Sequence, residues 1–176
     1  MAGNNENTPL EIERKFLIRM PDGARLARES ERRIEITQIY LRVDAHTQSR
    51  RLRHSRWDGG QARYFTEKIH LTDRTRIERE REISDAEWEA LLPERDEHRR
   101  VIEKTRWCVP FEGHTLEIDV FPFWTDRAFL EVELAAEDET ISLPDWIEVV
   151  REVTDDKRYT NSALALAIPE EAIDRA

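Results

Sequence analysis

Charged side chains occupy every second position in several short segments of the chain. Glu11, Glu13 and Lys15 form one such series, and Arg51 and Arg53 form another. In a β-strand, residues two apart point to the same face, about 6.6 Å from one another. Each segment can therefore present charges side by side. The full set is Glu11, Glu13, Lys15, Arg51, Arg53, Lys68, Glu78, Glu80, Glu82, Lys104, Arg106, Glu117, Asp119, Glu131 and Glu133.

The residue types in this set indicate a class of chemistry. Clustered carboxylates suit hard cations such as Mg²⁺ or Mn²⁺, whereas the five histidines show no zinc-ligand spacing. Paired arginines and lysines donate hydrogen bonds to phosphate oxygens. The sequence contains no Walker A loop, no dinucleotide-binding glycine motif and no GxSxG motif. Carboxylate-held metal beside converging bases favours phosphoryl chemistry.

Two interpretations of the alternating charges are open. Such residues commonly lie on the solvent-exposed outer face of a sheet, where cross-strand pairs of opposite charge form. Alternatively, they line the interior of a barrel, which requires that they neutralise one another and bind ions. Without Glu82, the set has eight acids and six bases, a net charge of −2. One or two divalent cations would offset this, leaving the bases for a polyanion. The regular alternation over seven strands favours the interior.

The elements that position these charges are predicted to be mainly strands. Extended segments are expected at residues 10–18, 34–43, 49–57, 61–71, 75–83, 101–109, 114–121 and 127–135. Turn signals at Asp58-Gly59-Gly60 and Glu112-Gly113 predict two hairpins. We therefore expect a mainly β (α+β) fold, an eight-stranded antiparallel sheet closed into a barrel with flanking helices.

Helices are expected in only a few places. Ser84 and Glu87 form a capping box that predicts a helix over 85–92, which Pro93 ends. A second helix is predicted from about residue 159 to 168, and residues 22–31 read as a short helix or irregular connector. Residues 1–9 are polar and are expected to be flexible. Residues 10–176 are predicted to form a single domain.

Composition excludes several classes of protein. The 176 residues include 28 Lys and Arg against 38 Asp and Glu, a net charge of −10, which disfavours nucleic acid as a partner. No apolar segment approaches the roughly 20 residues that span a bilayer. The N-terminus has no apolar core of a signal peptide. A single cysteine, Cys108, fits a reducing cytoplasm. We expect a cytoplasmic protein without a membrane partner.

The order of these motifs resembles the CYTH family, also called triphosphate tunnel metalloenzymes. The resemblance rests on a series that runs from about residue 10 to 168. The series comprises Glu11-x-Glu13-x-Lys15, Gln38-x-Tyr40-Leu41, Arg51-x-Arg53, Thr66-x-Lys68, Glu78-x-Glu80, Lys104-Thr105-Arg106, Glu117-x-Asp119-x-Phe121, Glu131-x-Glu133, Glu152-Val153-Thr154 and Arg158-Tyr159-x-Asn161. Glu67 departs from it, because the family usually has an apolar residue there.

The resemblance implies an eight-stranded antiparallel tunnel that binds a triphosphate together with Mg²⁺ or Mn²⁺. The implied metal ligands are Glu11, Glu13, Glu131 and Glu133. The residues implied to complete the metal set or orient water are Glu78, Glu80 and Asp119. The implied phosphate-binding residues are Lys15, Arg51, Arg53, Lys68, Lys104 and Arg106, with Lys157 or Arg158 at the tunnel mouth.

The expected activity is metal-dependent hydrolysis of a triphosphate. Inorganic tripolyphosphate, cleaved to pyrophosphate and phosphate, is the leading substrate, because the chain lacks an accessory domain and a base-recognition pocket. Thiamine triphosphatase and class IV adenylate cyclase remain as enzymatic alternatives, since all share a triphosphate substrate. A non-catalytic module that binds polyphosphate or nucleotide is an alternative of another class.

Overall fold

The computed structural model describes residues 12–44, 47–72 and 75–173, with the backbone alone for residues 48, 69–72 and 75–78. The elements in chain order are β1 (Ile12–Arg19), α1 (Gly23–Glu29), β2 (Arg32–Tyr40), β3 (Thr47–Trp57), β4 (Gly60–Thr72), β5 (Thr75–Glu82), α2 (Asp85–Leu91), β6 (Ile102–Phe111), β7 (His114–Val120), β8 (Arg127–Leu134), β9 (Val149–Glu152) and α3 (Asn161–Leu166). Short 3-10 turns, Leu92–Glu94 and Lys157–Tyr159, follow α2 and precede α3.

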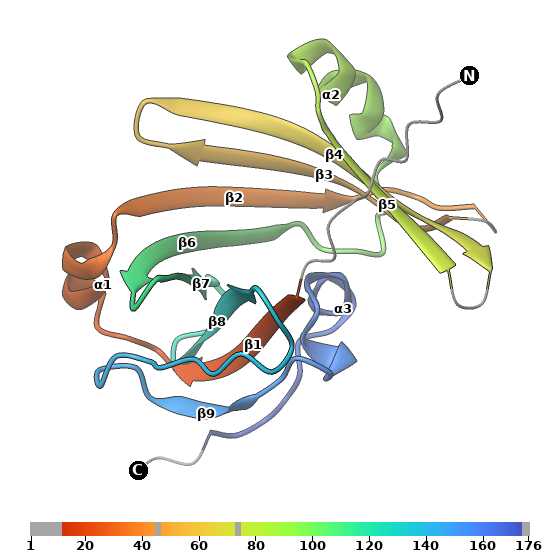
Figure 1. Cartoon of the computed structure of the whole chain (residues 1–176). Helices are drawn as coiled ribbons and strands as arrows, with labels where there is room; N and C mark the ends of the chain where they lie inside the picture. Colours follow the sequence, from red (N-terminus) through yellow and green to blue (C-terminus); the bar gives the residue numbers. More distant parts are fainter. Residues whose placement is uncertain (1–11, 45–46, 73–74, 174–176) are drawn as a thin grey trace, which may run out of the picture.

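All of these strands form one antiparallel sheet, in the order β5-β4-β3-β2-β6-β7-β8-β1-β9. The sheet curls strongly through β6, β7, β8, β1 and β9, whereas β3, β4 and β5 extend away from this curved part (Figure 1). The predicted mainly β fold is therefore confirmed. Within the described ranges, no hydrogen-bonded pairing joins the edge strands β5 and β9.

The sequence predicted eight strands, and the structure has a ninth. The added strand, β9, pairs with the free edge of β1, with Phe16 opposite Glu152 and Leu17 opposite Arg151. It lies in a segment for which the sequence predicted no strand, because four residues are too few to show an alternating pattern. It forms because backbone groups on the exposed edge of β1 require hydrogen-bond partners.

The predicted hairpin turns are present. Gly59 connects β3 to β4 with a φ of 83°, a left-handed conformation that glycine adopts without steric cost. Glu112 and Gly113 connect β6 to β7 with φ values of 45° and 85°. Positive φ at both central positions matches the twist of the two strands. These turns fix the registers of β3 with β4 and of β6 with β7.

The predicted capping box begins α2, whereas the last predicted helix begins later than expected. At α2, Ser84 accepts a hydrogen bond from the Glu87 backbone and the Glu87 side chain reciprocates, which confirms the capping box. Trp88 of α2 is buried with Leu41 and Leu52 against the outer face of the sheet. The helix predicted over 159–168 is shorter in the structure, where α3 follows a 3-10 turn and is capped by Thr160.

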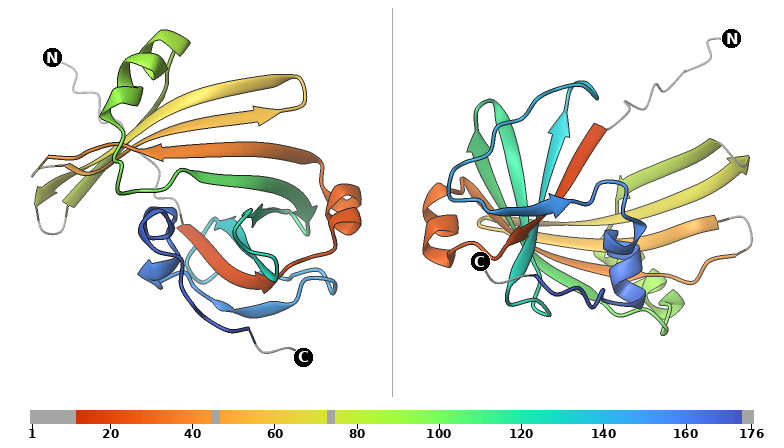
Figure 2. Two further views of the ribbon diagram at one scale, coloured as in Figure 1. Left: turned by 180° about the vertical axis from the view of Figure 1, so that it is seen from behind. Right: turned by 90° about the horizontal axis from the view of Figure 1, so that it is seen from below.

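Apolar residues cover both faces of the sheet, and they separate by strand parity. Phe16, Ile18 and Leu130 belong to an outer cluster that includes Leu26 of α1. Their chain neighbours Leu17 and Phe129 point the other way. They belong to an inner cluster with Phe121, Trp124, Tyr159 and Leu164, which we call the aromatic cluster. α3 therefore packs on the side toward which the sheet curves (Figure 2). None of the described helices is long and apolar enough to cross a membrane.

Candidate active site on the inner face of the sheet

The strand registers bring the alternating charges onto the inner face. Lys15 lies opposite Glu131, which in turn lies opposite Glu117. Asp119 lies opposite Arg106 on β6. Because cross-strand partners point to the same side of a sheet, charges from β1, β6, β7 and β8 share one face. The interior interpretation is supported by burial: the exposed fractions are 9% for Lys15, 3% for Lys104, 0% for Asp119 and 6% for Glu131.

One group of these charges is centred on Arg106. Its guanidinium donates to both carboxylate oxygens of Asp119 at 2.7 Å and to Glu131 Oε2 at 2.6 Å, and it also contacts Glu117. Lys15 Nζ approaches Glu131 Oε1 at 2.7 Å, and Lys104 donates to Asp119. We call this group the Arg106 cluster: Lys15, Lys104, Arg106, Glu117, Asp119 and Glu131.

The Arg106 cluster holds its charges by mutual compensation. Burial alone would raise the pKa of Asp119, but Lys104 and Arg106 hold it well below its usual range. Burial opposes the charge on Arg106 as well, yet its carboxylate partners raise the pKa of the guanidinium. Burial raises the pKa of Glu117, since Arg106 only partly offsets the lost hydration. Asp119 and Arg106 are therefore ion-paired near neutral pH, whereas burial lowers the pKa of Lys104 as it raises that of Glu117.

A second group of charges lies on β3, β4 and β5. Arg53 donates to Glu80 Oε1 at 2.6 Å, and Arg51 approaches Glu80 Oε2 at 3.6 Å. Thr66, which is 1% exposed, donates to Glu80 Oε2 at 2.7 Å. The Nε atoms of both arginines are buried and have no hydrogen-bond partner among the described residues. We call this group the Arg53 cluster: Arg51, Arg53, Thr66 and Glu80.

The two clusters are electrostatically connected across β2. Burial is the main cause that lowers the pKa of Arg53, Glu80 opposes the shift, and the positive charges of Arg51 and Arg106 add to it. Mutual repulsion of this kind favours a bound anion. An array of arginines with incompletely used donors is suited to bind phosphate oxygens.

Glu13 and Glu133 face one another at the solvent-exposed end of the β1–β8 pair. Partial loss of hydration and the negative charge of Glu131 raise the pKa of Glu13 to about 7. A divalent cation would relieve this repulsion, so the donor chemistry fits Mg²⁺ or Mn²⁺. Glu11, the remaining predicted ligand, lies outside the described residues. Among the residues that the structure describes, no three acidic, histidine or cysteine side chains converge on a metal position.

The other predicted site residues occupy different positions. Lys68 lies opposite Glu78 in the register of β4 with β5. This pair is two residues further along the strands than the pair of Thr66 with Glu80. Only the backbone of Glu78 is described. Arg158 is exposed and donates to both oxygens of Asp156, at 2.9 and 2.6 Å, so it belongs to neither cluster.

The aromatic cluster borders the charged residues on the inner face. Lys15 Nζ lies 4.1 Å from the centre of the Phe129 ring, and Lys104 Nζ lies 5.8 Å from that of Phe121. Ring faces attract cations, which helps to fix both ammonium groups. Gln38, Tyr40 and Thr66 also lie on this face and are buried, although the sequence did not predict them as site residues. The sequence signal that could have identified them is their position in the motif series, where they alternate in the same way as the charged residues.

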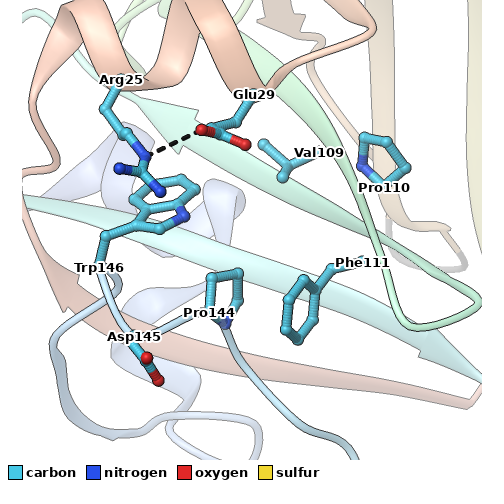
Figure 3. A pocket seen from close by; sticks show the side chains of 8 residues that line it. All are labelled: Arg25, Glu29, Val109, Pro110, Phe111, Pro144, Asp145 and Trp146. Carbon is cyan, nitrogen blue, oxygen red and sulfur yellow. Dashed lines mark ion pairs between the residues drawn. The ribbon is translucent and has the colours of Figure 1, made fainter.

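A separate hollow of about 490 Å³ lies on the opposite side of the sheet (Figure 3). Its lining includes Val109, Phe111 and Trp146, and the ion pair of Arg25 with Glu29, 3.0 Å apart, lies at its edge. Val109 belongs to the outer apolar cluster. The hollow therefore shares no residue with the charged clusters and lacks their chemistry.

The antiparallel sheet with a charged inner face is the arrangement that the sequence motifs predicted for a CYTH domain. A model of the CYTH domain matches residues 9–158, and the chain belongs to this family.

Individual relatives agree with this assignment. The chain is 35% identical over 164 residues to an inorganic triphosphatase of Nitrosomonas europaea, which covers 90% of this chain and 99% of that protein. It is 41% identical over 102 residues to an inorganic triphosphatase of Acetivibrio thermocellus, over 57% of this chain and 64% of that protein. The crystal structure of the inorganic triphosphatase NE1496 superposes with a TM-score of 0.57 at 34% identity, covering 92% of this chain and 97% of that one.

Proposed function

We propose that this protein hydrolyses inorganic tripolyphosphate to pyrophosphate and phosphate with the help of a divalent cation. The observation that carries the proposal is the inner face itself, where bases from β1, β3 and β6 lie among carboxylates and two arginines retain unused donors. The relatives named inorganic triphosphatase support the same substrate class. We expect a small-molecule triphosphate as the partner and no nucleic acid, and a cytoplasmic location.

Phosphate binding falls to the bases in this proposal. Arg51 and Arg53 exchange the Glu80 carboxylate for phosphate oxygens, since both present planar donor sets that match an oxyanion. Lys104 and Arg106 supply positive potential from within the Arg106 cluster. The proposed phosphate-binding set is Lys15, Arg51, Arg53, Lys68, Lys104 and Arg106, with Arg158 toward the edge of the site.

The carboxylates have two proposed roles. Glu13, Glu131 and Glu133, together with Glu11, would hold the cation. In proteins, Mg²⁺ commonly takes one or two carboxylates and completes its shell with substrate phosphates and water. Bound there, it would neutralise charge on the phosphoryl group and act as a Lewis acid. Glu78, Glu80 and Asp119 would complete this set or orient water. With its lowered pKa, Asp119 is better suited to hold Lys104 and Arg106 than to accept a proton.

A phosphate-release assay tests the proposal. The substrates are tripolyphosphate, thiamine triphosphate, ATP and pyrophosphate, each with Mg²⁺, with Mn²⁺ and with EDTA, and cyclic AMP is measured alongside. We expect tripolyphosphate to be turned over fastest and EDTA to abolish turnover. Cyclic AMP formation would favour a cyclase. Binding of tripolyphosphate without phosphate release under any condition would favour a non-catalytic module.

A further inference from the structure

Gln38 is a buried polar residue on the inner face to which the proposed reaction assigns no role so far. It lies on β2, directly opposite Arg53 on β3 and Ile102 on β6. Its side chain is 3% exposed, and its Oε1 atom has no hydrogen-bond partner in the described part of the chain. An unpaired buried amide oxygen costs stability. The Oε1 atom therefore adds no hydrogen bond to the stability of the fold.

In the protein without substrate, the neighbouring carboxylate acceptors are engaged. Glu80 accepts from Arg53 and Thr66, and Asp119 accepts from Lys104 and Arg106. The Gln38 amide thus offers an acceptor that no ion pair occupies. The oxygens of a triphosphate are also acceptors, so they cannot form a hydrogen bond with the Oε1 atom of Gln38. The reactant that carries a donor is water.

We propose that Gln38 orients the attacking water against the phosphoryl group that Arg53 binds, an inference that rests on the proposed function. The water donates one O–H to Gln38 Oε1, and its oxygen forms a bond to the terminal phosphorus. The bond from that phosphorus to the bridging oxygen breaks, and its electron pair leaves with pyrophosphate. One proton of the water stays on the released phosphate, and the other passes to solvent. Gln38 itself gains and loses nothing.

A neutral amide suits this reaction. Phosphoryl transfer passes through a loose transition state, in which positioning of the nucleophile matters more than removal of its proton. A carboxylate at the same place would repel the anionic substrate. Because Oε1 is shielded from bulk solvent, the water it holds enters together with the substrate, when Arg51 and Arg53 turn from Glu80 to phosphate.

The test compares Gln38→Met and Gln38→Glu with the wild type, using tripolyphosphate and saturating Mg²⁺. Gln38→Met keeps the shape and removes the acceptor. We expect kcat to fall about 100-fold, the size of effect that misplacement of a reactant causes. KM should change less than about threefold. The melting temperature should stay the same or rise, because an unpaired polar group is removed. Gln38→Glu restores an acceptor, so its kcat should exceed that of Gln38→Met by about tenfold and rise with pH as the carboxylate ionises.

Gln61→Met is the matched control. Gln61 lies on β4 and bonds His54 at 2.8 Å, both of the parity opposite to that of Arg53. It should leave kcat unchanged. An active wild type beside a Gln38→Met variant that keeps its kcat would overturn the role of Gln38. So would a loss that appears only in KM, which would make Gln38 a phosphate ligand. A wild type that releases no phosphate would instead bring down the proposed function, and the water-orienting role with it.

Discussion

The Arg106 cluster and the Arg53 cluster both pair arginine with carboxylates, and they differ in how many carboxylates each arginine contacts. Arg106 contacts three carboxylates and its side chain is 15% exposed. Arg53 contacts one carboxylate, is 24% exposed and keeps a buried Nε atom without a partner among the described residues. Glu80, the shared acid of the Arg53 cluster, is 33% exposed, whereas Asp119 is 0% exposed.

This difference separates structural charge from functional charge. Buried ions require one another, because removal of either partner leaves the other dehydrated and unpaired. The partly exposed pairs of the Arg53 cluster are weaker, because solvent screens them more than it screens the Arg106 cluster. A phosphate oxygen can replace Glu80 at small cost, whereas nothing can replace Asp119 cheaply. The Arg106 cluster thus provides a fixed electrostatic base, and the Arg53 cluster provides the exchangeable contacts.

The largest expected effect comes from removing the centre of the buried cluster. Arg106→Met leaves Asp119, Glu131 and Glu117 without their shared partner. We expect the free energy of unfolding to fall by roughly 3–5 kcal/mol, the cost of breaking a buried pair. Arg53→Met should cost no more than about 1 kcal/mol, because Glu80 retains Arg51, Thr66 and water. Urea denaturation of both variants measures the two values. Equal losses of stability would remove the distinction between the clusters.

A second prediction concerns the length of the substrate. Bases from several strands should engage more oxygens of a triphosphate than of a pyrophosphate. Each charge-assisted hydrogen bond contributes about 1.5–3 kcal/mol, so the loss of two contacts lowers kcat/KM by roughly 100-fold or more. Tripolyphosphate should be preferred over pyrophosphate by at least about this factor, and Arg53→Ala should reduce the preference. Equal turnover of both substrates would show that the bases do not measure length.

The smallest effect is a dependence of stability on pH. The pKa of Glu13 is raised from 4.5 to about 7 in the folded protein. In this range the folded state binds more protons than the unfolded state, so the contribution of Glu13 to stability falls as pH rises from about 4.5 to about 7. The Glu13→Gln variant should not lose stability in this way, because its amide does not ionise. In EDTA it should therefore melt higher than the wild type at about pH 8 and no higher at about pH 5.

The thermal shift with Mg²⁺ at about pH 8 sharpens this prediction, since a bound cation should stabilise the wild type more than Glu13→Gln. Glu133→Gln, which alters the carboxylate opposite Glu13, is the matched variant. The thermal shift that Mg²⁺ produces should be smaller in Glu133→Gln than in the wild type, as it is in Glu13→Gln. A wild type whose stability rises steadily across this pH range would contradict the proposed repulsion.

Much of the fold followed from local patterns in the sequence. The period of two placed Glu13 and Lys15 on the same face of β1, as the structure has them. Gly59 and Gly113 marked the hairpins through turn chemistry. These features depend on residues near one another in the chain. β9 escaped prediction because its formation depends on the free edge of β1, more than 130 positions away.

The candidate site was predictable by residue type and less so by role. Alternation identified Arg53 and Arg106 alike, and no local signal distinguished the fully paired arginine from the partly paired one. That distinction depends on which carboxylates the cross-strand register supplies. Gln38 was passed over because an amide carries no charge to stand out in the pattern. Arg158 was included by motif, although its nearest acid, Asp156, is a local partner.

The most direct test of the account compares two arginines of β3. Arg53 lies on the inner face, whereas Arg50 has the opposite parity and pairs with Glu94 at 2.5 Å, with a similar exposed fraction of 22%. The measurement is kcat/KM for tripolyphosphate with saturating Mg²⁺ in Arg53→Met, Arg50→Met and the wild type. We predict a loss of about 100-fold for Arg53→Met and less than about threefold for Arg50→Met. Similar values for the two variants would contradict the proposal that the inner face of the sheet binds the triphosphate.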